Sequence, residues 1–489
     1  MATKSKAKEL DARTALAKLT YGYNLADLKR FEAIGLDTWL EDQLSPNAVR
    51  KAEGEIDLTA FRSRNMSIPA IYRDKIFKAR PSILSTEMVH MTLLRRLYSS
   101  RQVYEMLVEH FSDYVPVQLL TNKQLVRLDY DTNVIRKNAL GYYPKLLAAA
   151  TFHPAMLNYL NGDTNTARNS NENYGRELLE LFTITPAAGY SETDVKQAAK
   201  MLSGITWGVS TDHSTVNLKD HYFGELKIFG HVDKNKPTDS PGAVVQRISR
   251  MVSYLALRPE TATAFSKRMA RRFAADVPSK TLISAMAKSY LKSKGHIPTV
   301  FRTMVLHPEF LASGLTKVKR PMEHVGSTVR ALNLRLATPI PPVNPAAPNA
   351  YFGSSPMVPI YRLLETQGHL PFAWPFPDGY PDKAETWTTL SSQVQRWNLV
   401  NKIATNKMGN AFAEHDFTTE LTSGANTPEQ ILSELSIRFY GANLATTERT
   451  EVLKLLKTVS ENGDQAKYVN RVAAMATALL MSKPEWNLR

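Results

Sequence analysis

The chain has 489 residues, of which 43% are hydrophobic and 22% are charged, a composition typical of a folded globular protein. Lys and Arg outnumber Asp and Glu by 61 to 46, which gives a net charge of +15. The basic residues are spread in small groups, without a zinc-finger or RNA-binding pattern, so we predict a basic surface and no specific nucleic-acid site. The absence of cysteine excludes disulfides, thiolate metal sites and cysteine nucleophiles.

Neither end of the sequence indicates export or membrane insertion. Residues 1–10 contain basic side chains but no apolar stretch after them, so we predict no signal peptide. The longest uncharged apolar segment near the end, 472–481, is far shorter than the ~20 residues of a membrane-spanning helix. We therefore expect a soluble, cytoplasmic protein with no transmembrane segment, and leave open an exported form whose signal peptide has been removed.

The spacing of apolar residues predicts a mainly α fold. Apolar side chains recur every three or four residues over most of the chain, which is the pattern of amphipathic helices. Asp11 is a candidate cap for the first helix, and Ser191 and Asp194 have the spacing of a capping box. We predict a large multi-helix body whose clearest helices cover residues 15–28, 87–111, 194–202, 262–273, 281–291 and 447–459.

Two regions interrupt this helical pattern. Residues 209–241 are polar, with alternating apolar residues at 222–228, and predict a small β-hairpin. Residues 338–357 contain six prolines and predict a long loop or linker. These interruptions suggest five parts: 1–208, 209–242, 243–336, 337–372 and 373–489.

One short pattern occurs three times, near His153, His307 and Lys483. In each case an apolar helical segment runs into a residue followed by proline. Proline has no N–H group, and the first turn of a helix does not need one, so it can end one helix and open the next. We interpret the pattern as repeated helix–turn–helix boundaries rather than as a binding motif.

Several segments, taken in their order along the chain, resemble the signature segments of the bacterial domain-of-unknown-function family 1800. They are NENYGRELLELFT at 171–183, FSKRMARRF at 265–273, KVKRPME at 317–323 and WPFPDGYP at 374–381. The resemblance spans nearly the whole chain. It implies a helical bacterial protein that is often encoded beside a sulfatase-like partner, and it implies no reaction.

The chain departs from this family at positions where relatives carry histidine. Asp113 and Tyr114 stand where many relatives have an Asn-His pair, and Asn138 and Phe182 stand where many have His. A family chemistry that required these imidazoles is therefore lost in this chain. We assign no metal-ligating residues, although a divalent cation held by carboxylates stays open.

The helix predicted at 171–183 carries an acidic stripe. Arg176, Glu177 and Glu180 fall on one face with Glu172 at its edge, and Arg176 can pair with Glu172 and Glu180, each four residues away. Periodicity alone favours a solvated face. The family signature favours a functional one, so these four residues are our candidate catalytic residues, as acid/base groups or cation ligands.

Other candidate binding residues are scattered. Asp131 and Arg136 match family positions and can contact the acidic helix or form a local ion pair. His221 lies in the polar hairpin region with His213 and His231, where three histidines could meet as metal ligands or remain separate surface groups. The separate arrangement is the favoured one.

The proline-rich aromatic segment at 374–381 is the last candidate. Its prolines stiffen the backbone, and its rings can stack on sugars or plug one helical part against another. Trp374, Asp378 and Tyr380 are candidate binding residues here, and Arg396 is another in the same part of the signature.

The sequence lacks the motifs of common hydrolases, nucleotide-dependent enzymes, dehydrogenases and zinc proteases. Two hypotheses follow, and whether the chain is an enzyme stays open. The first is a binding or maturation partner of an envelope-associated, sulfatase-like protein. The second is a hydrolase or lyase that acts on a glycan or other polymer through the Glu/Arg helix face. No cofactor is indicated beyond the open question of a divalent cation.

Overall fold

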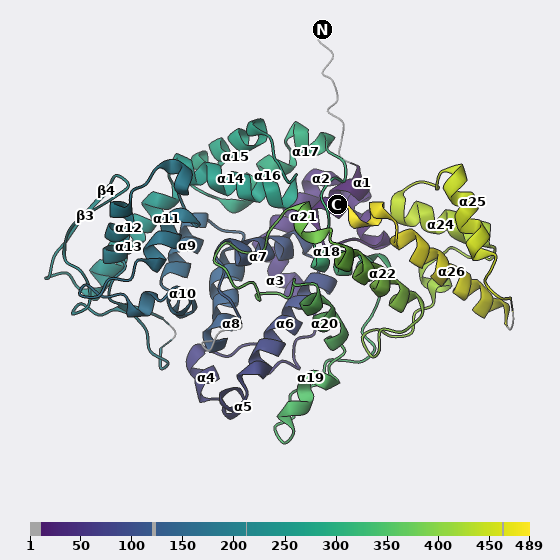
Figure 1. The fold of residues 1–489 in the computed structure, drawn as a ribbon, viewed down its shortest axis with the longest axis horizontal. Helices are drawn as coiled ribbons and strands as arrows, with labels where there is room; N and C mark the ends of the chain where they lie inside the picture. The colour runs from purple at the N-terminus through teal and green to yellow at the C-terminus, as the bar shows by residue number, and fades with distance from the viewer. Residues whose placement is uncertain (1–10, 120–123, 212, 462–463) are drawn as a thin grey trace, which may run out of the picture.

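The computed structural model describes residues 11–119, 124–211, 213–461 and 464–489, and residues 1–10, on which the absence of a signal peptide was predicted, lie outside them. The predicted mainly α fold is confirmed. Helices form one wide body in which both ends of the described chain reach the centre (Figure 1). The first half contains α1 (Ala12–Leu19), α2 (Leu25–Leu44), α3 (Pro46–Glu53), α4 (Ile68–Arg73), α5 (Lys75–Ala79), α6 (Pro81–Tyr98), α7 (Gln102–Tyr114), α8 (Arg127–Asp129), the π-helix η2 (Tyr130–Arg136), α9 (Tyr143–Thr151), α10 (Pro154–Tyr159), α11 (Asn173–Glu180) and α12 (Glu192–Met201).

The second half begins with the small strands and continues as helices. The strands are β1 (Ile205–Thr206), β2 (Thr215–Val216), β3 (Gly224–Ile228) and β4 (His231–Asn235). The helices are α13 (Pro241–Ala256), α14 (Pro259–Phe273), α15 (Lys280–Lys292), α16 (Ile297–Val305), α17 (Pro308–Ala312), α18 (Pro321–Ala331), α19 (Tyr351–Ser354), α20 (Val358–Thr366), α21 (Ala384–Trp387), α22 (Leu390–Ala404), α23 (Phe417–Leu421), α24 (Pro428–Tyr440), α25 (Thr446–Leu456) and α26 (Gln465–Met481).

The predicted caps are present. The Asp11 carboxylate accepts hydrogen bonds from the amides of Arg13 and Thr14 at the start of α1. Ser191 and Asp194 form the reciprocal capping box that begins α12. Each such cap contributes about 1 kcal/mol because it satisfies amides that have no partner within the helix.

The helix predicted at residues 15–28 is in fact two helices, α1 and α2. Gly22 separates them with a φ of +117°, and a Cβ on this residue would lie 2.3 Å from the Cα of Ser327. Asn24 then opens α2 with a capping box. The close approach of α18 therefore breaks a helix that apolar spacing alone continues.

The helix predicted at residues 87–111 is also two helices, α6 and α7, which turn at Ser99. The side-chain amide of Gln102 donates hydrogen bonds to the carbonyls of Arg96 (3.1 Å) and Ser99 (2.9 Å). These bonds satisfy carbonyl groups at the end of α6, where the helix ladder stops. A polar side chain thus replaces the backbone partners of a continuing helix.

The predicted hairpin is confirmed as β3 and β4, which pair antiparallel from Gly224 opposite Asn235 to Ile228 opposite His231. The two-residue turn has positive φ at both Phe229 and Gly230, as tight hairpins require. The strands β1 and β2 form a second small antiparallel sheet. The hairpin lies beside α12 and α13 at one end of the body (Figure 1).

The three proline boundaries are confirmed. Pro154, Pro308 and Pro484 stand at the first positions of α10, α17 and the final 3-10 turn, each directly after another helix. The proline-rich stretch is irregular until the short helix α19 interrupts it.

Buried apolar side chains form one continuous cluster from α1 to the final turn at Trp486. Arg489 donates hydrogen bonds from its guanidinium to the carbonyls of Lys18 and Arg272, which ties the last residue to α1 and α14. The five-part division of the chain stays a prediction. Within the described ranges, no helix has the length and apolar character to cross a bilayer.

Candidate functional site

A buried network of charged residues lies at the centre of the body, on α7. The carboxylate of Glu109 contacts the guanidinium groups of Arg96 (2.7 Å), Arg272 (2.6 Å) and Arg320. All four side chains are almost completely buried. Burial acts to raise the pKa of Glu109, but the three arginines outweigh it and hold that pKa well below its usual value.

Glu323 is the second acid of this network and opens α18. It pairs with Arg272 and with Arg489 (3.0 Å), and it accepts a hydrogen bond of 2.7 Å from the amide of Arg320. Burial acts to raise its pKa, but Arg272, Arg489 and Arg320 dominate and lower it to about 2. The network therefore joins α7, α14, α18 and the end of the chain through buried charges, each of which is compensated by charges of opposite sign.

Because the folded pKa of Glu323 lies below the unfolded value of about 4.3, this group stabilises the fold above that pH. We expect its contribution, roughly 3 kcal/mol, to disappear as the pH falls from about 4.3 to about 2. Urea unfolding at a series of pH values should show the stability gap between the parent and Glu323→Gln narrowing over this window. A gap that stays constant with pH would contradict the lowered pKa.

The positive side of the network faces a cavity of about 730 Å³. The cavity lies between α7, α14, the segment after α11 and the loop that follows Trp374. Six basic and four acidic side chains line it, so its walls carry a net positive charge: the basic residues are Lys267, Arg268, Arg271, Arg272, Arg320 and Lys383, and the acidic residues are Asp113, Glu260, Asp378 and Asp382.

Asp113 is the acid that joins the network to the cavity. Its carboxylate accepts a hydrogen bond of 2.9 Å from Arg320, and its side chain keeps 19% of its surface exposed. Burial raises the pKa of Asp113, Arg320 opposes this change and Glu109 adds to it, with the result at about 6. A carboxyl group of this kind exchanges protons near neutral pH, which general acid–base catalysis requires.

His110 lies one turn before Asp113 and also lines the cavity. Burial lowers its pKa well below the usual value, and Arg268, Arg272 and Arg320 act in the same direction, so the ring is neutral. Its Nε2 atom has no hydrogen-bond partner among the described residues. A neutral imidazole with an unpaired, buried nitrogen therefore stands behind the cavity wall.

The aromatic segment forms the opposite wall. Arg268 donates hydrogen bonds of 2.6 Å to the carbonyls of both Asp113 and Asp378, which joins α7, α14 and this segment. Gly379 has a φ of +74°, and a Cβ there would lie 2.0 Å from the carbonyl oxygen of Asp113. Only glycine permits this contact.

The aromatic segment contains both buried and exposed rings, and the choice between its two predicted uses stays a prediction. Tyr380 is buried and donates a hydrogen bond of 2.7 Å to the Leu370 carbonyl, as a packing plug would. Phe376 is 59% exposed, as a ring that stacks on a ligand would be. Trp374 is half-buried and donates its ring N–H to Asp378 (2.9 Å).

The acidic helix α11 is a half-solvated face. Arg176 pairs with Glu192 (2.7 Å) and with Glu172 (3.5 Å), while Glu180 accepts a hydrogen bond of 3.1 Å from the Tyr190 hydroxyl. Within the described residues, the predicted ladder therefore forms only on its Glu172 side. These contacts agree with the solvated-face alternative more closely than with a closed network.

Glu177 is a member of this stripe that interacts electrostatically with Asp378 of the aromatic segment. Burial raises its pKa, and the neighbouring carboxylates of Glu180 and Asp378 raise it further. Tyr159 on α10 donates a hydrogen bond of 3.0 Å to the carbonyl of Pro375, which places α10 against the same segment. Glu177 thus lies toward the aromatic segment, whereas the cavity itself is lined by residues 184–188 after α11.

Asp131 and Arg136 form the local ion pair, at 2.8 Å, inside the π-helix η2. Arg136 also binds Glu105 of α7 through hydrogen bonds of 2.9 and 3.0 Å. This pair is buried and joins η2 to α7. These bonds therefore match the predicted local ion pair and make no contact with the acidic helix α11.

His221 and Arg396 have structural partners. One ring nitrogen of His221 lies 2.8 Å from the Ser203 carbonyl and the other lies 2.9 Å from Asn235. Arg396 is buried and donates hydrogen bonds to the Lys319 carbonyl (2.6 Å) and Asn487 (3.0 Å). No group of three His, Cys, Asp or Glu residues that would suit a metal ion occurs in the described part of the chain.

The positions that lack family histidines differ in their surroundings. Tyr114 lies under the guanidinium of Arg268, 4.3 Å from its carbon to the ring centre. Phe182 is buried, and Asn138 donates a hydrogen bond of 2.8 Å to the Val134 carbonyl. Among these positions, Asp113 is the one that places an ionisable group in the cavity.

A family model described as "Protein of unknown function (DUF1800)" matches residues 14–488. The chain belongs to the DUF1800 family. No curated protein and no solved structure matches it. The resemblance predicted from the signature segments is therefore confirmed.

The fold of this DUF1800 chain explains why separate signature segments occur together. Residues 265–273 supply α14, residues 374–381 supply the aromatic wall, and residues 317–323 supply Arg320 and Glu323. Sequence reasoning identified these segments but gave no role to their arginines, and it treated Asp113 only as a departure from the family. The available signal was the group of four basic residues in FSKRMARRF, Lys267, Arg268, Arg271 and Arg272, which lie within about one and a half helical turns of one another.

Proposed function

We propose that this protein binds an acidic polymer, an anionic glycan being the class that fits best, and cleaves it with Asp113 as the general acid or base. The observation that carries the proposal is the position of the Asp113 carboxyl group. It is partly exposed in the wall of a cavity that is otherwise rich in basic side chains.

The charge of the cavity supports an anionic ligand. Lys267 and Arg271 lie one turn apart on α14 and keep part of their surface in solvent, where they can pair with carboxylate or sulfate groups. The Nε atom of Arg271 also donates a hydrogen bond of 3.3 Å to the Asp276 carbonyl. Arg272 and Arg320 form ion pairs with buried acids, and they provide a fixed positive field behind Lys267 and Arg271. Phe376 precedes the residues of the same segment that line the cavity, and it adds an exposed ring that suits a sugar face.

Within this proposal we favour elimination over hydrolysis. In an elimination, one base removes the proton from the carbon beside a substrate carboxylate, and nearby cations stabilise the charge that develops there. The electron pair then forms a C=C bond as the C–O bond to the neighbouring sugar breaks, and the leaving oxygen takes up a proton from water to become a hydroxyl group. Asp113 and the cavity arginines supply these two groups. The test is to incubate the protein with uronate-rich and sulfated polysaccharides and to follow the ultraviolet absorbance of unsaturated products together with new reducing ends. Absence of both signals over the whole panel would contradict a polymer-cleaving function.

Ligand affinity gives a separate prediction. We expect Lys267→Gln/Arg271→Gln to weaken binding of an acidic oligosaccharide by about 10-fold or more, because each charged contact contributes ~1.5 kcal/mol or more. Titration calorimetry at low salt measures the change. The matched control is Lys288→Gln/Lys292→Gln, which removes the same charge at the same spacing from α15, outside the residues that line the cavity. Equal loss in both variants would indicate nonspecific attraction.

The second candidate function is a binding or maturation partner of a sulfatase-like protein. The observation that favours it is an exposed apolar face on α22, where Leu390, Val394 and Trp397 are 79%, 42% and 47% exposed. A stable complex with a sulfatase-like protein from the same host would support this role. Asp113→Asn would retain such a complex, whereas it would strongly reduce the rate of cleavage, so the two functions can be separated.

A further inference from the structure

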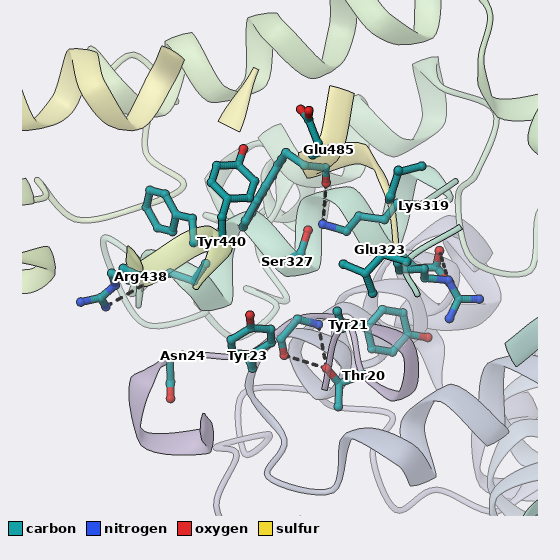
Figure 2. Close-up of a pocket in the computed structure, with 18 of the residues that line it drawn as sticks. Thr20, Tyr21, Tyr23, Asn24, Lys319, Glu323, Ser327, Arg438, Tyr440 and Glu485 are labelled. Carbon is teal, nitrogen blue, oxygen red and sulfur yellow. Dashed lines mark hydrogen bonds and ion pairs between the residues drawn. The ribbon is translucent and has the colours of Figure 1, made fainter. Parts of the chain in front are cut away.

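A second, smaller cavity of about 70 Å³ lies near the junction of the two chain ends. Figure 2 shows it between the turn after α1, helix α18 and the end of the chain. Leu25 and Leu315 line it and are 37% and 36% exposed, so the cavity reaches solvent. Its wall contains apolar and aromatic residues, Ala17, Tyr21, Tyr23, Phe439, Tyr440 and Trp486 among them, and also the charged residues Glu323, Arg438, Glu485 and Arg489.

Lys319 extends its amine into this cavity (Figure 2). Its Nζ atom donates a hydrogen bond of 2.6 Å to the Trp486 carbonyl and lies 4.2 Å from the centre of the Trp486 ring. No carboxylate lies within 4.0 Å of it in the described residues. The nearby Lys317 differs, because it pairs with both Asp276 and Asp382.

This environment disfavours an ammonium ion. A buried amine that lacks an acidic partner loses its hydration without an equivalent gain, so its neutral form is favoured. Burial lowers the pKa of Lys319 to about 7, and Arg396 and Arg489 lower it in the same direction, while Glu323 opposes them. In about half of the molecules the Lys319 amine is therefore unprotonated near neutral pH. A neutral amine has a free electron pair and is a nucleophile.

We propose that Lys319 is a nucleophilic amine that captures a small, uncharged aldehyde in this cavity as a Schiff base. The Nζ lone pair attacks the carbonyl carbon and forms a C–N bond. The carbonyl oxygen takes up the two protons of the neutral amine and leaves as one water molecule, and a C=N bond remains. No oxidant or reductant is needed. The small size of the cavity admits only a short chain, and its apolar and aromatic wall residues suit an aliphatic one.

This site is separate from the cavity that contains Asp113. Lys319 belongs to the 317–323 signature segment, of which the larger cavity uses Arg320. Lys319 itself lines only the smaller cavity of the two. Its chemistry does not depend on acidic-polymer cleavage, so either function can fail alone.

The test uses propanal and cyanoborohydride, which reduces the Schiff base to a stable amine. The full chain is treated at pH 7, digested and analysed by mass spectrometry for propyl groups on each lysine. We expect Lys319 to be labelled about 100-fold faster than the exposed Lys292, because an ordinary lysine with a pKa near 10.4 is almost wholly protonated at this pH. Raising the pH to about 9 should accelerate labelling of Lys319 only about 2-fold, because half of its amines are already unprotonated at pH 7.

Two variants separate a cavity reaction from general exposure. Ala17→Leu places a larger side chain in the cavity wall, on a helix that tolerates leucine, and should slow labelling of Lys319 by roughly 10-fold while leaving Lys292 unchanged. Lys319→Arg should remove that adduct alone. Thermal unfolding of both variants checks that the fold is retained. Labelling of Lys319 no faster than Lys292, or unaffected by Ala17→Leu in a folded chain, would overturn the proposal.

Discussion

Glu109→Gln should lower the free energy of unfolding by about 3–5 kcal/mol. The carboxylate of Glu109 is the common partner of Arg96, Arg272 and Arg320, all of which are buried. Glutamine keeps the size of the side chain but removes the charge that offsets three guanidinium ions. The desolvation of these guanidinium ions is then no longer offset by attraction to an acid. For this reason, removal of a buried partner lowers the free energy of unfolding far more than removal of a partner from an exposed pair.

Urea unfolding followed by circular dichroism measures this effect at pH 7. The control is Glu172→Gln, which removes one acid of the exposed pair with Arg176 and should change stability by less than about 1 kcal/mol. If Glu109→Gln were no more destabilising than Glu172→Gln, the network would not hold α7, α14 and α18 together as we infer.

Asp113→Asn should reduce the cleavage rate by roughly 100-fold to 10,000-fold, the contribution that a positioned acid or base usually makes. Asparagine retains an oxygen for the Arg320 hydrogen bond but cannot exchange a proton. Because the pKa of Asp113 is raised to about 6, the rate of the parent should fall as the pH drops below this value, where the base becomes protonated. The remaining activity of the variant should lack that dependence.

Steady-state rates on an active polysaccharide between about pH 4.5 and pH 8 test this prediction. Glu192→Gln serves as the control, since Glu192 is an exposed acid that pairs with Arg176 and lines no part of the larger cavity. A full rate in Asp113→Asn, or a variant that keeps the dependence near pH 6, would exclude Asp113 as the acid or base.

Local features of the chain could be predicted because their causes are local. The caps at Asp11 and Ser191 and the prolines at Pro154 and Pro308 act within a few residues, and each is found where the sequence places it. Helix interruptions at Gly22 and Ser99 were missed. The first depends on α18, about 300 residues away, so apolar spacing contains no signal for it.

The candidate site was only partly predictable for the same reason. The acidic stripe of α11 is conspicuous in sequence because Glu172 and Arg176 are four residues apart, yet its pairs lie at the surface. The Arg272–Glu109 and Arg320–Glu109 pairs join residues 163 and 211 positions apart. Such separations leave no periodic pattern, and only packing brings these charges together.

By itself the sequence determined the helical class, the family, the hairpin and many helix ends, because composition, apolar period and capping act over short distances. Only the tertiary structure decided which charges are buried. In the sequence, Asp113 is only a position where the chain departs from its family. In the structure, it is an acid with a raised pKa, placed where α7 meets α18 and the aromatic segment. Its chemistry depends on burial and on neighbours distant in sequence, and both are properties of the folded chain.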